Sequence, residues 1–130
     1  MYPDALIRAT TRLSRRSSGD LRLIRRATTR IEEVSAALDR QLQAEPRPDE
    51  QVRLLRQATS QITRAANDAI QAYRRVTDGL EQERRRTDTD AGEAARMAQS
   101  LARARAEMLE ALDVASRRYP WAKPWRPAED

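Results

Sequence analysis

Apolar and small residues recur at steps of three and four over three long stretches of the chain, which is the pattern of amphipathic helices. Gly19 is the weak point of the first stretch, residues 4–44, because glycine costs about 1 kcal/mol relative to alanine inside a helix. The apolar stripe keeps its phase across Gly19, so we predict one continuous helix in preference to a break that restarts at Asp20. On a helical wheel the stripe is about 120° wide. It consists of Leu6, Ala9, Leu13, Ser17, Leu21, Ile24, Ala27, Ile31, Val34, Leu38 and Leu42.

Two further helices are expected, over residues 49–86 and 90–119. Pro46 and Pro48 separate the first two helices, and Pro120 ends the third, because proline disfavours a helical conformation in the residue before it. The stripe of the second helix is Val52, Leu55, Ala58, Ile62, Ala66, Ala69, Tyr73, Val76 and Leu80. The stripe of the third helix is Ala94, Met97, Leu101, Ala104, Met108, Leu112, Ala115 and Tyr119.

Helices of these lengths span about 60, 55 and 45 Å at 1.5 Å per residue, and short connections favour antiparallel neighbours. We therefore predict an all-α fold, an elongated antiparallel three-helix bundle of coiled-coil type over residues 1–119. A Pro- and Trp-containing C-terminal tail follows at residues 120–130. The third helix is expected to end near the first loop, where Trp121 and Trp125 of the tail would cover the end of the bundle.

The composition lacks the residue types on which most catalytic sites depend. The chain contains no Cys and no His, and its three Gly are isolated, so thiol chemistry, the usual general base and a Gly-rich phosphate loop are all missing. Paired carboxylates such as Glu107 and Glu110 lack the His that helical di-metal sites use. We expect no catalytic, cofactor-binding or metal-binding residues, and a protein that is not an enzyme.

No apolar run approaches the ~18 residues of a membrane-spanning helix, and no signal-peptide core follows Met1. We therefore expect a soluble, cytoplasmic protein for which association with a membrane is the weaker alternative. The basic residues are 24 Arg and one Lys, a bias typical of GC-rich bacterial genomes.

The net charge of +5 is concentrated at the start of the chain, where residues 1–30 carry eight Arg against two Asp. A row of Arg opposite an apolar stripe suits nucleic-acid phosphates or an acidic partner. No aromatic residue interleaves with these Arg, so any nucleic-acid binding would be non-specific. The alternative is a solvated polar face. The candidate residues are Arg8, Arg12, Arg15, Arg16, Arg22, Arg26 and Arg30.

The tail offers a second candidate site, because Pro-rich segments with aromatic residues dock onto partner proteins in extended form. Trp121 and Trp125 would be the docking residues, or else they cap the chain's own bundle. The thin, Ala-rich stripes also suggest that self-association would stabilise the fold. We expect a helical interaction or assembly protein, a scaffold or adaptor for a protein partner or for itself. Non-specific nucleic-acid binding through the Arg face is the alternative.

Overall fold

The chain forms three long helices, and the computed structural model describes their residues together with the first loop, at 4–86 and 91–118. Side chains are described for residues 17–86 and 91–117. No strand occurs within these ranges. The helices are α1 (Asp4–Ala44), α2 (Pro48–Arg84) and α3 (Ala91–Arg118).

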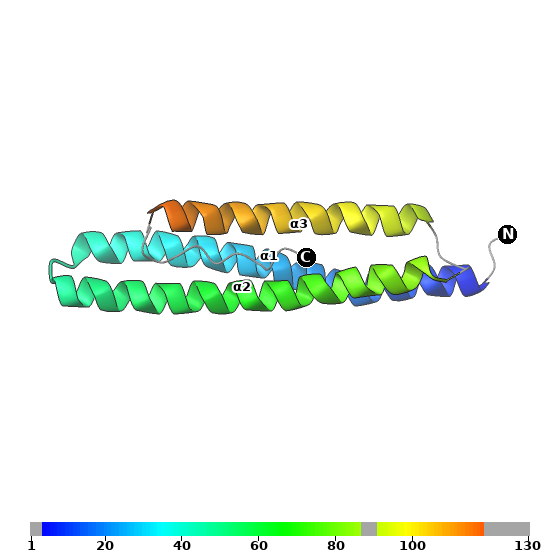
Figure 1. Ribbon diagram of the computed structural model, residues 1–130, viewed down its shortest axis with the longest axis horizontal. Coiled ribbons are helices and arrows are strands. Elements are labelled where there is room, and N and C mark those ends of the chain that lie inside the picture. Colours follow the sequence, from blue (N-terminus) through cyan, green and yellow to red (C-terminus); the bar gives the residue numbers. More distant parts are fainter. Residues whose placement is uncertain (1–3, 87–90, 119–130) are drawn as a thin grey trace.

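The prediction of an elongated all-α three-helix bundle is confirmed (Figure 1). Helices α1 and α2 form a long antiparallel hairpin, and α3 lies along both of them, running in the same direction as α1. Helix α1 passes through Gly19 without a break, as the continuous apolar stripe predicts. Helix α2 begins one residue earlier than expected and ends two residues earlier. Residues 90 and 119, where the prediction placed the two ends of the third helix, lie outside the described residues.

The hairpin loop is fixed by short-range hydrogen bonds. Pro48 occupies the first turn of α2, where its missing N–H is not needed, and two acidic residues follow it at the positive end of the helix dipole. The Arg47 guanidinium donates to the Glu45 carboxylate with its Nε at 2.8 Å, and this hydrogen bond is the main cause that lowers the pKa of Glu45. Gln51 Nε2 donates to the Glu45 carbonyl at 2.7 Å. These contacts close the turn between α1 and α2.

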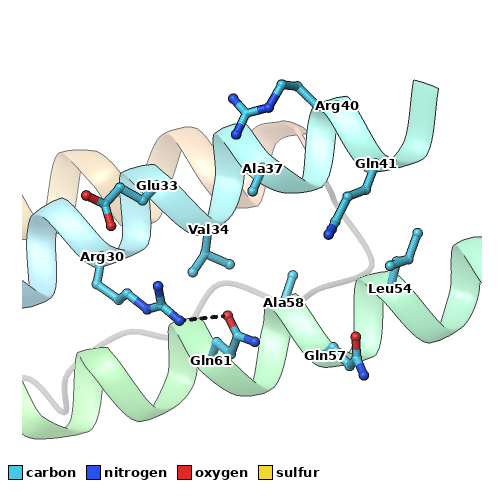
Figure 2. A pocket seen from close by; sticks show the side chains of 10 residues that line it. All are labelled: Arg30, Glu33, Val34, Ala37, Arg40, Gln41, Leu54, Gln57, Ala58 and Gln61. Atoms are coloured by element: carbon cyan, nitrogen blue, oxygen red, sulfur yellow. Dashed lines mark hydrogen bonds between the residues drawn. The ribbon is translucent and has the colours of Figure 1, made fainter. Parts of the chain in front are cut away.

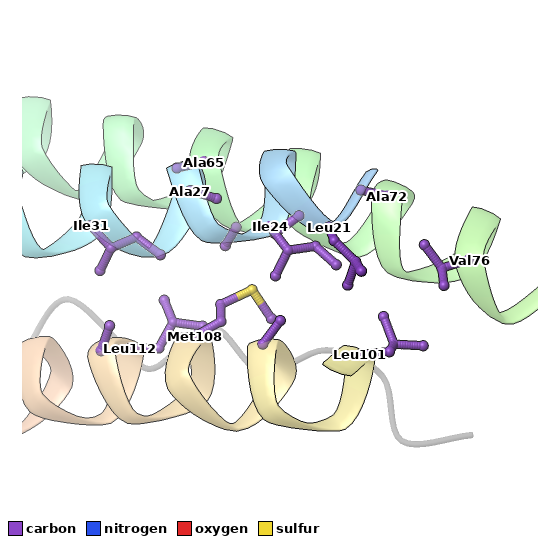
Figure 3. Packing of buried hydrophobic residues seen from close by; sticks show 14 of the residues in the cluster. Leu21, Ile24, Ala27, Ile31, Ala65, Ala72, Val76, Leu101, Met108 and Leu112 are labelled. Atoms are coloured by element: carbon purple, nitrogen blue, oxygen red, sulfur yellow. The ribbon is translucent and has the colours of Figure 1, made fainter. Parts of the chain in front are cut away.

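The core is a continuous seam between the three helices (Figure 3). Ile24 and Ile31 of α1 are fully buried, and Met108 of α3 is 2% exposed. Facing them, α2 contributes mainly Ala, and small side chains let helix axes approach closely. The cluster contains Leu21, Ile24, Ala27, Ile31, Ala65, Ala66, Ala69, Ala72, Val76, Met97, Leu101, Ala104, Met108, Ala111 and Leu112.

Polar contacts between helices lie at the edge of this seam. Arg75 of α2 pairs with Asp20 of α1 at 2.9 Å, and the guanidinium of Arg105 on α3 lies 5.8 Å from the ring centre of Tyr73 on α2. Exposed ion pairs contribute about 0–1 kcal/mol, so these contacts specify register more than they stabilise the bundle. The apolar seam carries the stability.

The tip of the hairpin differs from two expectations. Helix α3 has nine residues fewer than α2, about 14 Å at 1.5 Å per residue. It therefore stops well short of the loop and does not end beside it (Figure 1). A small cluster of α1 and α2 residues alone continues the core there, around Leu38 and Leu55. Val52, which the stripe placed in the core, is 45% exposed, since no third helix covers the first turn of α2.

No helix, over the residues described, is long and apolar enough to cross a lipid bilayer. The expected placement of Trp121 and Trp125 at the end of the bundle lies outside the described residues.

Candidate interaction surface

The most apolar described cavity is an open groove of about 580 Å³ between α1 and α3. Each wall is one face of a helix, and the two helices run in the same direction (Figure 1). The α1 wall consists of Glu32, Ser35 and Ala36. The α3 wall consists of Ala106, Glu107, Glu110, Ala111 and Val114.

The floor of the groove is apolar and its rim is acidic. Alanines supply most of the floor, and because they are short they leave space that a Leu or Met would fill. Val114 is 44% exposed, one of three large apolar side chains that the described surface leaves exposed, with Leu23 and Val52. Glu32, Glu107 and Glu110 are exposed and stand around these apolar groups. The arrangement suits a helix that presents small or apolar side chains with basic residues beside them.

One polar atom of the groove lacks a partner. The hydroxyl oxygen of Ser35 is buried and has no hydrogen bond to any described residue. By contrast, the buried Thr28 hydroxyl, two turns earlier on α1, donates to the Ile24 carbonyl at 3.1 Å. A buried hydroxyl without a partner is a net cost to the fold.

A second cavity, of about 280 Å³, lies between α1 and α2 (Figure 2). Its lining mixes polar and apolar side chains in nearly equal measure. Arg30 Nη2 donates to the Gln61 side-chain oxygen at 3.3 Å across it, and Glu33, Arg40 and Gln41 occupy its α1 side. A smaller share of apolar surface and an internal hydrogen bond make it a weaker candidate for a partner's side chains than the α1–α3 groove.

Only three of the seven Arg-face residues have side chains within the described range. Arg22, Arg26 and Arg30 are exposed. Arg22 Nε donates to the Ser18 carbonyl at 3.4 Å. Among the described side chains, no carboxylate pairs with any of these three guanidinium groups. The side chains of Arg8, Arg12, Arg15 and Arg16, and both Trp of the tail, lie outside the described residues.

Sequence reasoning missed the α1–α3 groove. The apolar stripes assigned Ala36, Ala106 and Val114 to no core face, and the nearby carboxylates to ordinary polar surface. The sequence did contain one signal for the groove, because these three apolar residues lie on helix faces that are otherwise charged. Which helix stands beside which face is decided by packing, so the sequence did not reveal that these positions meet.

The described residues contain no group of three or more His, Cys, Asp or Glu arranged to hold a metal ion. Comparison with known protein families, with curated proteins and with solved structures finds no match to this chain. The fold class, a three-helix bundle, is therefore the only classification that the structure and the comparisons define.

Proposed function

We propose that this protein is a non-enzymatic helical interaction protein that works by packing a further helix into the groove between α1 and α3. The observation that carries the proposal is the combination of an exposed apolar floor, around Ala36 and Val114, with an acidic rim. A fourth helix laid there would complete a four-helix arrangement around the existing seam.

Energetics favour such an occupant. Covering apolar surface stabilises a complex by about 25 cal/mol per Å², and the short floor residues let the backbone of a second helix come close. The carboxylates of Glu32, Glu107 and Glu110 would lie at the edge of the interface, where they select a basic partner and speed its association.

The test is site-specific photo-crosslinking in the native host. A photoreactive amino acid replaces Ala36 in the groove of the full chain, and in a matched control it replaces Gln71, an exposed position on α2 outside the groove. The proposal predicts a discrete protein crosslink from position 36 and none from position 71. Equal crosslinking from both positions, or none from position 36, would refute it.

A second candidate function is non-specific nucleic-acid binding through the Arg face. It is favoured by Arg22, Arg26 and Arg30, whose exposed charges no described carboxylate neutralises. Binding of this kind weakens steeply with salt, because each neutralised phosphate releases a counterion.

Fluorescence anisotropy of a labelled DNA duplex, titrated at several salt concentrations, tests this second function. The comparison variant replaces six residues of the Arg face with Gln: Arg8, Arg12, Arg15, Arg22, Arg26 and Arg30. Binding that falls with salt and disappears in the variant would support a nucleic-acid partner. An absence of binding at about 0.15 M salt, where the Debye length is about 8 Å, would dismiss it.

A further inference from the structure

Basic residues continue both walls of the groove in the direction of the helix N-termini. Arg25 lies seven residues before Glu32 on α1, and Arg103 lies seven residues before Glu110 on α3. Seven residues are close to two helical turns, so in each pair the two residues lie on the same helix face, about 10.5 Å apart. Both Arg are exposed, and neither pairs with a carboxylate among the described side chains.

The two walls therefore carry the same charge pattern. Helices α1 and α3 run in the same direction (Figure 1), so on each wall positive charge precedes negative charge along that direction by an equal distance. The groove has a basic half, formed by Arg25 and Arg103, and an acidic half, formed by Glu32 and Glu110.

A surface with this pattern complements itself when it is turned end over end. In a dimer whose two-fold axis lies between the two copies and crosses the groove at a right angle, α1 of one copy lies over α1 of the other, α3 lies over α3, and the chain directions are opposed. Arg25 of each copy then lies over Glu32 of the other, and Arg103 lies over Glu110. Because Glu32 and Glu110 line the same groove and the two charge steps are equal, one position of the axis satisfies both kinds of pair. A parallel arrangement would instead place like charges opposite each other.

From this pattern we propose that the occupant of the groove is a second copy of this chain, bound in an antiparallel, two-fold symmetric dimer. The inference rests on the proposed function, since it names the partner of the same groove. The dimer covers the exposed Val114 and Ala36 of both copies and places four intermolecular ion pairs between the two apolar patches. It also brings a second backbone over Ser35, whose hydroxyl has no described partner.

Charge reversal tests the pairing. Sedimentation of the full chain is measured over a range of concentrations for four versions: wild type, R25E with R103E, E32R with E110R, and all four changes together. The two double variants each turn four attractive pairs into repulsive ones, and we expect the dimer dissociation constant to rise by at least about thirtyfold in each. The fourfold variant restores every pair with its signs exchanged. An equimolar mixture of the two double variants also gives four attractive pairs, because one copy then carries only Glu and the other only Arg at these positions. Both should dimerise about as well as wild type.

A matched control is R56E with R74E, which changes the net charge as R25E with R103E does, at two exposed positions of α2. It should leave the dissociation constant within about twofold of wild type. Circular dichroism of every variant separates loss of association from loss of folding. Added salt should weaken the wild-type dimer, because the four ion pairs lie at the rim.

Several results would overturn the inference. One is a wild-type chain that stays monomeric at about 1 mM, where even a weak specific dimer forms. Others are double variants that dimerise as wild type does, and a fourfold variant that stays monomeric while folded. A crosslink from position 36 to a different protein, or to the chain's own tail, would also overturn it. The crosslink to a different protein leaves the proposed function standing, so the two failures are distinguishable.

Discussion

Replacing Ile24 with Ala is the sharpest test of the core, because this side chain is fully buried where all three helices meet (Figure 3). The change removes three carbon atoms. At about 0.8 kcal/mol for each buried CH₂, the lost transfer free energy is about 2.4 kcal/mol. The residual cavity adds to this, so we expect a loss of about 3–4 kcal/mol in the free energy of unfolding. That is a large share of the roughly 5–15 kcal/mol available to a protein domain.

The assay is urea unfolding followed by far-UV circular dichroism. All variants are compared at one protein concentration, since self-association would add to the apparent stability. Ile24→Val should lose only about 1 kcal/mol. The matched control is Leu23→Ala, one residue away on the same helix, where the side chain is 38% exposed. It should cost clearly less, about 1 kcal/mol or below. If Ile24→Ala and Leu23→Ala differ by less than about 1 kcal/mol, the reasoning that places Ile24 in the three-helix seam is wrong.

Three further predictions follow from local features. Gly19→Ala and Gly79→Ala should each stabilise the chain by about 0.5–1 kcal/mol in thermal unfolding. Both glycines are inside helices, and a new Cβ at either position meets no atom within 4 Å. A loss of stability at either site would contradict the continuous helix there. Ser35→Ala should be neutral or stabilising by up to about 1 kcal/mol in urea unfolding, because it removes a buried hydroxyl without a described partner. A loss of stability above about 1 kcal/mol would mean that the Ser35 hydroxyl makes a hydrogen bond in the folded protein. The Glu45 carboxyl should titrate by NMR with a pKa below 4.5, and Arg47→Ala should return this pKa toward 4.5, because the hydrogen bond from Arg47 favours the carboxylate. The pKa of Glu45 in the folded protein lies below its value in the unfolded chain. The stability from this contact is therefore present at pH values above the unfolded pKa and is lost as the pH falls through the folded pKa. An unchanged Glu45 pKa in the Arg47→Ala variant would show that Arg47 is not the cause.

The sequence determined the secondary structure almost completely, because a helix is encoded locally. Steps of three and four predicted α1 across Gly19, and proline chemistry placed the turn at Pro46 and Pro48. Helix lengths and short connections were then enough to predict the bundle. These are properties of neighbouring residues, so a single sequence carries them.

The tertiary structure alone decided what the helix faces do. Val52 continues the stripe of α2 but is exposed, because α3 is too short to reach it, and periodicity does not report the length of a neighbouring helix. Ala36 and Val114 lie 78 residues apart in the sequence, and only the placement of α3 beside α1 makes them one groove. The charge steps from Arg25 to Glu32 and from Arg103 to Glu110 are likewise readable in the sequence. They acquire a meaning only because packing sets the two helices side by side in the same direction.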